Sequence, residues 1–165
     1  MTTITIRLGI LTASDKGAAA ERRDTSGDAI REMLSSLDVS VERYEIVPDE
    51  VEEIASRLRR WADEDKLDVV LTTGGTGFDP RDVTPEATLA VIDRSAPGLA
   101  EAMRAEGMRH TANAMLSRAT AGLRGKTIIV NLPGSERGVR ESLACLVPVL
   151  EHAVRTARGR YGDHD

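Results

Sequence analysis

Segments with the pattern of a buried β-strand alternate with segments of amphipathic-helix pattern along most of this chain. Strand-like runs rich in Ile, Val, Leu and Thr are separated by runs that repeat apolar residues every three or four positions. The predicted strands span 4–12, 40–47, 68–73 and 127–131, and the predicted helices span 26–37, 50–65, 98–107 and 139–158, with another beginning at Thr84-Pro85. Such alternation is typical of a mostly parallel sheet with helices on both faces. We therefore predict one α/β domain over 1–165, in which 159–165 is a frayed polar tail.

Polar or glycine-rich segments follow all four predicted strands. They are Thr12-Ala13-Ser14-Asp15, Pro48-Asp49-Glu50, Gly74-Gly75-Thr76-Gly77 and Leu132-Pro133-Gly134-Ser135. The carboxyl ends of parallel strands meet at one edge of a sheet, and ligands of such sheets bind there. One such loop is weak evidence for a site, whereas four that converge predict a binding crevice.

Three glycines in four residues follow the apolar strand that ends at Thr73. Gly74, Gly75 and Gly77 allow backbone N–H groups to approach an anion, and Thr73 and Thr76 add hydroxyl donors. A turn that needs positive φ is the structural alternative. The block matches neither a Walker A loop nor a dinucleotide-binding fingerprint, yet its place at a strand end favours a phosphate site.

Two aspartates at these strand ends are candidate ligands for a hard cation. Asp82 lies two residues before the predicted helix cap at Thr84, so capping explains it poorly, and Mg²⁺ beside bound phosphates explains it better. Asp49 has an ordinary role available as the N-cap of the helix 50–65, with Glu52 completing a capping box. The residues alone therefore favour a site role for Asp82 and a capping role for Asp49.

Four further segments have both a structural and a functional explanation. Ser14-Asp15 and the stretch 24–27 either form loops and helix caps or make a mobile flap over the crevice. Pro133-Gly134-Ser135 either makes a stiff turn into the last helix or offers backbone N–H groups to a second anion. In Ser117-Arg118, the arginine either faces solvent or pairs with a phosphate.

The composition excludes several classes of protein. A formal net charge of −5 and an aromatic content of 2% argue against a general nucleic-acid binder, which needs a basic stripe or stacking platforms. No apolar run reaches the length of about 20 residues that spans a bilayer. Cys145 is the single cysteine and cannot form an intrachain disulfide, so we expect a cytoplasmic protein.

Four segments of the chain are distinctive in combination. They are Thr72-Thr73-Gly74-Gly75-Thr76-Gly77, Asp82-Val83-Thr84-Pro85-Glu86-Ala87-Thr88, Met115-Leu116-Ser117-Arg118 and Asn131-Leu132-Pro133-Gly134-Ser135. Together they resemble the MogA/MoaB family of molybdenum-cofactor biosynthesis proteins, to which the G domain of gephyrin is related. The similarity runs from Ile10 to about Ala153. The glycine block alone also occurs in molybdenum insertases and CinA-type proteins, but the combination is specific.

The resemblance implies a three-layer α/β/α sandwich, in agreement with the strand and helix pattern. It implies a molybdopterin adenylyltransferase, a nucleotidyltransferase that transfers AMP from Mg-ATP to the terminal phosphate of molybdopterin and releases pyrophosphate. The family's essential acidic pair falls on Asp49 and Asp82, which are thereby implied as catalytic residues and Mg²⁺ ligands. A homo-oligomer, trimer or hexamer, and contact with other cofactor-biosynthesis proteins such as the molybdenum insertase are also implied.

On this basis the loops supply the predicted substrate-binding residues. They are Ser14, Asp15, Thr73, Gly74, Gly75, Thr76, Gly77, Ser117, Arg118, Pro133, Gly134 and Ser135. Phosphoryl transfer depends on positioning and charge neutralisation, which agrees with the lack of a Ser–His or Cys–His pairing signal. Two alternatives stay open: a catalytically silent molybdopterin-binding MoaB-like paralogue, and a CinA-type nucleotide pyrophosphatase in which water is the nucleophile.

Overall fold

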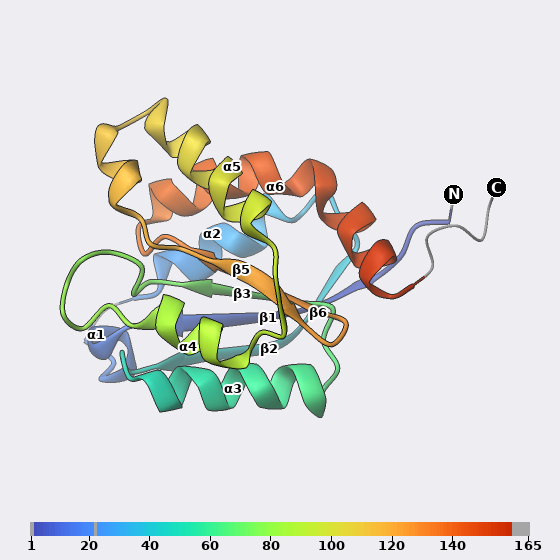
Figure 1. The fold of residues 1–165 in the computed structure, drawn as a ribbon, viewed down its shortest axis with the longest axis horizontal. Helices are drawn as coiled ribbons and strands as arrows, with labels where there is room; N and C mark the ends of the chain where they lie inside the picture. The colour runs from blue at the N-terminus through green and yellow to red at the C-terminus, as the bar shows by residue number, and fades with distance from the viewer. Residues whose placement is uncertain (1, 22, 160–165) are drawn as a thin grey trace.

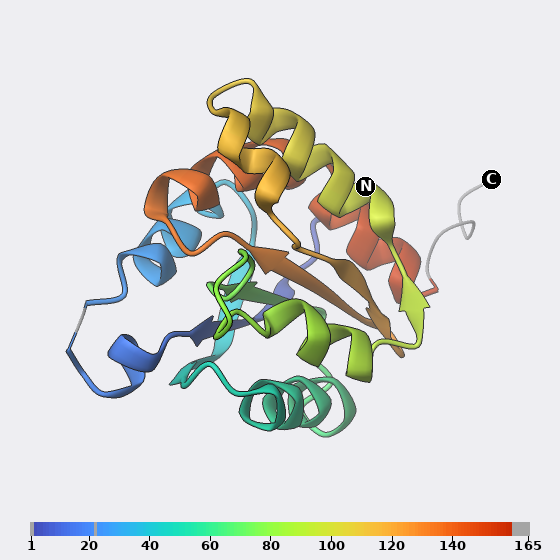
Figure 2. The same cartoon turned by 60° about the vertical axis from the view of Figure 1, so that its left-hand side comes forward.

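A six-stranded sheet lies between two layers of helices in the computed structural model, which describes residues 2–21 and 23–159 (Figures 1 and 2). The strands are β1 (Ile6–Ala13), β2 (Val39–Val47), β3 (Val69–Thr73), β4 (Arg94–Ser95), β5 (Ala121–Arg124) and β6 (Thr127–Leu132). The helices are α1 (Asp15–Ala18), α2 (Thr25–Met33), α3 (Val51–Asp63), α4 (Thr84–Val91), α5 (Pro97–Met108), the 3₁₀ helix η1 (Ala112–Leu116) and α6 (Glu136–Ala157). The predicted three-layer α/β/α sandwich is confirmed, whereas the predicted frayed tail falls, apart from Gly159, outside the described residues.

The sheet has the strand order β2-β1-β3-β6-β5-β4, and its first four strands are parallel. These four are the strands that the sequence predicts. β5 runs antiparallel to β6, and β4 runs antiparallel to β5. The prediction missed these two strands because β4 has two residues and β5 has four, too few for a period-of-two pattern to be recognised.

Alternate side chains of the central strands enter two separate cores. In β3, Val69 and Leu71 pack into the core shared with α2, α5 and α6, whereas Val70 packs into the core shared with α3 and α4. β6 follows the same rule, with Ile128 and Val130 in the first core and Ile129 in the second. Because both faces of the sheet are covered, these strands are continuously apolar.

A buried polar network fixes α4 against the sheet. The Nδ2 group of Asn131 in β6 donates to the hydroxyls of Thr72 in β3, at 3.0 Å, and of Thr88 in α4, at 2.8 Å. The Asn131 oxygen accepts the backbone N–H of Thr120. The Asn131 side-chain amide thus donates two hydrogen bonds and accepts one within the protein. The network therefore holds α4, the helix that begins two residues after Asp82, in one place.

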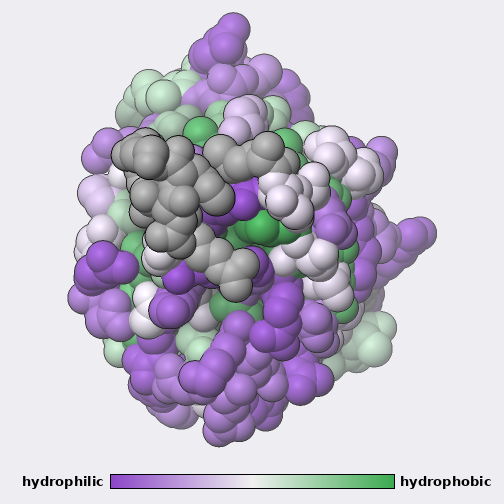
Figure 3. Space-filling view, turned by 90° about the vertical axis from the view of Figure 1, so that its right-hand side faces the viewer, coloured by the Kyte–Doolittle hydropathy of each residue, from purple (hydrophilic) through white to green (hydrophobic). Residues whose placement is uncertain are grey.

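The two ends of the sheet differ in what covers them. The loops that follow β1, β2, β3 and β6 gather at the carboxyl end, on the left of Figure 1. At the amino end the last helix meets the first strand, since the Arg158 guanidinium donates to Asp68 and to the Thr5 carbonyl. Figure 3 views this amino end, where hydrophilic residues predominate and hydrophobic areas are small. None of the described helices is long and apolar enough to span a membrane.

Candidate active site

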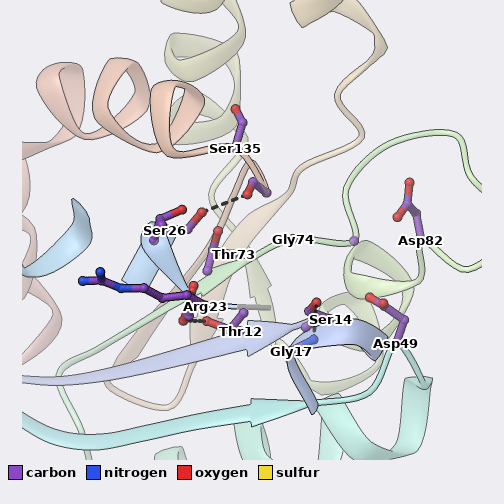
Figure 4. A pocket seen from close by; sticks show the side chains of 15 residues that line it. Thr12, Ser14, Gly17, Arg23, Ser26, Asp49, Thr73, Gly74, Asp82 and Ser135 are labelled. Atoms are coloured by element: carbon purple, nitrogen blue, oxygen red, sulfur yellow. Dashed lines mark hydrogen bonds between the residues drawn. The ribbon is translucent and has the colours of Figure 1, made fainter. Parts of the chain in front are cut away.

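A crevice of about 310 Å³ opens at the carboxyl ends of β1 and β3 (Figure 4). Eight predicted site residues line it: Ser14, Asp49, Thr73, Gly74, Gly75, Asp82, Gly134 and Ser135. Its other lining residues are Thr12, Ala13, Gly17, Arg23, Asp24, Thr25 and Ser26. The loops after the strands thus meet at one crevice, as the sequence predicts. Thr25 and Ser26 of α2 also line the crevice, although they belong to no strand-end loop.

Gly74 and Gly75 line the crevice at positions where neighbouring residues leave no room for a side chain. Gly74 and Gly75 have φ values of 91° and 68°. A Cβ on Gly74 would lie 2.4 Å from the Ala13 carbonyl oxygen, and one on Gly75 would lie 2.4 Å from the Thr84 hydroxyl oxygen. The Gly74 N–H donates to the Leu132 carbonyl, so this N–H is already hydrogen-bonded within the protein and does not point at a bound anion. Glycine is required here for both conformation and space.

Hydroxyl groups tie the turn after β6 to the rest of the crevice. Thr73 donates to the Pro133 carbonyl at 2.5 Å, and Ser26 donates to the Gly134 carbonyl at 2.8 Å. Ser135 is the N-cap of α6, and its hydroxyl accepts the N–H of Gly138. The start of this 22-residue helix therefore faces the crevice, where its partial positive charge favours an anion.

The two segments that the sequence left between cap and flap both serve as caps. Ser14 accepts the N–H of Gly17 at the start of α1. Asp24 accepts the N–H of Gly27 at the start of α2, and its second oxygen accepts hydrogen bonds from the hydroxyls of Thr12 and Tyr44. Asp24 was not predicted as a site residue, yet it joins β1, β2 and α2 at one point of the crevice wall.

Asp49 is not the helix cap that the sequence favoured. The N-cap of α3 is Glu50, which makes no side-chain cap bond. Asp49 and Asp15 instead exchange hydrogen bonds: the Asp15 N–H donates to Asp49 Oδ2 at 3.0 Å, and the Asp49 N–H donates to Asp15 Oδ1 at 2.9 Å. The remaining oxygen, Asp49 Oδ1, is buried without a partner in the described structure.

The surroundings of Asp49 disfavour its charged form. Burial raises the pKa of this carboxyl, and the carboxylates of Asp15 and Asp82 raise it further, while the Asp15 N–H and the Arg81 guanidinium oppose the rise. A buried carboxylate oxygen with no donor and two neighbouring negative charges is a site that a cation would stabilise.

Asp82 and Asp49 lie on the same side of the crevice, with Arg23 on the other side (Figure 4). Asp82 Oδ2 accepts the N–H of Asp79, and Asp79 Oδ1 accepts the N–H of Arg81, so Asp79 shapes the turn. Thr84 was the predicted cap of α4, but its hydroxyl donates to the Gly74 carbonyl, and Val83 is the N-cap. Asp82 therefore has no capping role, as the sequence indicated.

Arg118 holds the loop that carries Asp82. Its guanidinium donates to the carbonyls of Gly77 and Asp82, at 2.8 and 2.7 Å, and to both oxygens of Glu86. The sequence analysis considered only solvent or a phosphate as the partner of Arg118. It did not anticipate an ion pair with Glu86, because the two residues are 32 positions apart in the chain. Arg118 and Asp15 line neither this crevice nor the hollow beside it, and the Asp15 carboxylate pairs with Arg81.

A second hollow of about 420 Å³ lies between α5, η1 and the start of α6 and shares Ser135 with the crevice. The remaining predicted residues line it: Thr76, Gly77, Ser117 and Pro133. Ala100, Met103 and Gly107 of α5 contribute to its apolar part. Arg104 also lines it, and its guanidinium donates to the carbonyls of Ser117 and Ala119. This hollow was not predicted, since it forms only where η1 folds back on α5.

The family model described as a probable molybdopterin binding domain matches residues 9–152 of the chain. The chain belongs to this family.

Relatives of this molybdopterin-binding domain include enzymes and longer proteins. Molybdopterin adenylyltransferase of Helicobacter pylori strain J99 is 42% identical over 159 residues, which cover 95% of this chain and 90% of that protein. The crystal structure of the molybdopterin biosynthesis enzyme MoaB from Thermus thermophilus has a TM-score of 0.89 at 55% identity, covering 93% and 97% of the two chains. The molybdenum cofactor synthesis protein cinnamon of Drosophila melanogaster is 43% identical over 90% of this chain, which spans 25% of cinnamon's length.

The described residues of this molybdopterin-binding domain contain no group of three or more His, Cys, Asp or Glu side chains placed to hold a metal ion. Mg²⁺ needs no such group, because it commonly takes one or two carboxylates and completes its shell with water and substrate phosphates. Asp49, with its unpartnered oxygen, and Asp82 fit that requirement.

Proposed function

We propose that this protein is a molybdopterin adenylyltransferase that transfers AMP from Mg-ATP to the terminal phosphate of molybdopterin and releases pyrophosphate. The observation that carries the proposal is the buried, unpartnered Asp49 oxygen at the edge of a polar crevice that Asp82 also lines. The high identity to a protein named molybdopterin adenylyltransferase, over almost the whole chain, supports it.

In this reaction an oxygen of the molybdopterin phosphate attacks the α-phosphorus of ATP, and the bond from that phosphorus to the pyrophosphate oxygen breaks. Both substrates carry phosphate, so the protein must place two polyanions together. Two hollows that meet at Ser135 suit this task. The crevice is rich in backbone and hydroxyl groups, as a phosphate site requires, and the second hollow has the apolar walls that a flat ring requires.

Asp49 and Asp82 would hold Mg²⁺, which when bound neutralises phosphate charge. The chain's own contribution is to leave one oxygen of Asp49 without a donor. Asp49 Oδ2 accepts a single backbone N–H and Oδ1 accepts none, so the carboxylate keeps its capacity for a cation. The start of α6 places partial positive charge at the opposite wall of the crevice, where it favours phosphate.

The remaining predictions are part of the same proposal. We propose that the protein is cytoplasmic, that it assembles into a trimer or hexamer, and that it works beside a molybdenum insertase without binding nucleic acid or membranes. The association with an insertase is supported by longer relatives, such as the molybdenum cofactor biosynthesis bifunctional protein of Chlorobaculum tepidum, of which this chain spans 49%.

The test is to incubate the purified protein with Mg-ATP, with and without molybdopterin, and to measure pyrophosphate. Pyrophosphate that appears only when both substrates are present is the expected result. Pyrophosphate from ATP alone would instead support the CinA-type hydrolase, in which water is the nucleophile. Tight molybdopterin binding with no pyrophosphate would support the catalytically silent binding protein.

A further inference from the structure

Asp15 makes contacts that no binding role requires. Its carboxylate accepts two hydrogen bonds from one edge of the Arg81 guanidinium, with Nε to Oδ2 and Nη2 to Oδ1 distances of 3.0 Å each. The same Oδ1 accepts the N–H of Asp49, and the Asp15 N–H donates to Asp49 Oδ2. Both carboxylate oxygens of Asp15 are therefore engaged within the protein, and its negative charge would repel a polyphosphate.

These contacts join three separate loops. Asp15 follows β1, Asp49 follows β2, and Arg81 precedes Asp82 on the loop that follows β3. Asp15 begins the four-residue helix α1, Asp49 lies in the short segment between β2 and α3, and Arg81 lies in the loop between β3 and α4. The reciprocal bonds orient the Asp49 carboxylate so that Oδ1 stays free, and the guanidinium fork ties the Asp82 loop to the same residue.

The exposure of the pair limits what it can add to the stability of the fold. The side chains of Asp15 and Arg81 are 43% and 56% exposed. Exposed ion pairs of this kind add little to folding free energy, because solvent screens them and ordering two side chains opposes the attraction. A planar fork fixes orientation as well as distance, so its value at this place is geometric.

We propose that Asp15 and Arg81 are positioning residues that set the spacing and orientation of the Asp49 and Asp82 carboxylates, rather than substrate contacts. This inference rests on the proposed function, because it gives those carboxylates their task. It gives Asp15 a different role from the substrate-binding one predicted from the sequence. Positioning partners of metal ligands typically change metal affinity or activity about 10–100-fold when they are removed.

The chain offers a matched control for this pair. Arg43 and Asp65 form a fork of the same kind, with Nε and Nη2 distances of 3.0 and 3.1 Å to the two carboxylate oxygens. Arg43 lies in β2, and Asp65 lies beyond the far end of α3, so this pair is distant from the crevice. Loss of the control fork should change neither metal binding nor turnover.

The experiment compares Asp15→Ala, Arg81→Ala and their double variant with Asp65→Ala, Arg43→Ala and theirs. Mn²⁺ binding in the presence of ATP is measured by electron paramagnetic resonance, and kcat and KM for molybdopterin are measured by pyrophosphate release. We expect each site variant to weaken Mn²⁺ binding and lower kcat by about tenfold or more, with KM for molybdopterin within about twofold of wild type. The double variant should lose no more than Asp15→Ala alone, since that change already removes the fork together with the acceptor of the Asp49 N–H. Arg81→Lys should recover only part of the loss.

Three results would overturn the inference. The first is Mn²⁺ affinity in the site variants equal to that of the Asp65→Ala control. The second is losses that multiply in the double variant, which would mean that Asp15 and Arg81 act independently. The third is a rise in KM for molybdopterin as the main effect of Asp15→Ala, which would restore the substrate-contact role. If wild type releases no pyrophosphate, the proposed function fails, while the Mn²⁺ titrations and their coupling still decide the positioning role.

Discussion

Asp68, which is buried, and Asp49, which is partly buried, lie at opposite ends of the sheet and have opposite surroundings. Asp68, just before β3 at the amino end, accepts the Arg7 N–H at 2.8 Å and two bonds from the Arg158 guanidinium at 2.8 and 2.6 Å. Burial alone would raise the pKa of Asp68, but the bonds from Arg158 and Arg7 outweigh it and hold the pKa below its usual value.

Asp49, just after β2 at the carboxyl end, accepts only one backbone N–H, at Oδ2, and burial raises its pKa. The fold could supply an arginine to a carboxylate, as it does at Asp68, and does not supply one directly to Asp49. The carboxyl end therefore gives up local stability to keep an acceptor available for a ligand, whereas the amino end uses the same residue type to close the structure.

The largest effect should follow loss of the charges at the carboxyl end. Asp49→Asn and Asp82→Asn should each lower kcat by about 10²–10⁴-fold, since several kcal/mol of charge stabilisation are removed at about 1.4 kcal/mol per tenfold. Binding of molybdopterin, followed by fluorescence quenching, should survive. Loss of binding and of folding together would contradict the metal role of Asp82, and kcat near wild type would remove the distinction between the two ends.

A smaller but clear effect is expected for stability at the amino end. Asp68→Asn should lower the free energy of unfolding by about 3 kcal/mol at pH 7, because it leaves the Arg158 charge without its partner. A carboxyl with a lowered folded-state pKa stabilises above its unfolded value of about 3.9 and loses that contribution as the pH falls through the folded value. Urea titrations at pH 7 and below pH 4 should therefore show a difference that shrinks on acidification. Turnover of the folded variant should stay within about twofold of wild type; a large loss would place Asp68 in the function.

The smallest effect should have the opposite sign. Without Mg²⁺ or ATP, Asp49→Asn should raise the free energy of unfolding at pH 7 by roughly 0.5–1 kcal/mol, because a buried charge without a partner is removed. A carboxyl with a raised folded-state pKa favours the native state below its unfolded pKa and loses this contribution as the pH rises through the folded value. The gain over wild type should therefore disappear in acid. A destabilised Asp49→Asn at pH 7, in urea titrations matched to those for Asp68→Asn, would show that Asp49 supports the fold as Asp68 does.

The sequence predicted the parallel strands and the crevice because local patterns determine both. Apolar runs that alternate with helical segments identify β1, β2, β3 and β6. Because these strands are parallel, the polar loops that follow them must meet at one edge of the sheet. Gly74 and Gly75 were recognised because only a residue without a side chain fits their backbone conformation and the space beside Ala13 and Thr84.

The roles of individual polar residues could not be predicted in this way. Asp49 stands where an N-cap would stand, and only its bonds with Asp15, 34 residues away, show that it is not one. Arg118 and Arg104 bind carbonyl groups whose positions depend on the folded loops. Hydrogen bonds over such separations depend on tertiary packing, which a single sequence does not encode in any local pattern.

The bond from Arg158 to the Thr5 carbonyl has a practical consequence for fusion and immobilisation. It brings the beginning and the end of the described fold together at the amino end of the sheet, whereas the crevice opens at the carboxyl end (Figure 1). A linker attached before Thr5 or after Arg158 would start on the side of the domain opposite to the crevice. Tethering this domain to a solid support or a second enzyme through either terminus should therefore leave the crevice open.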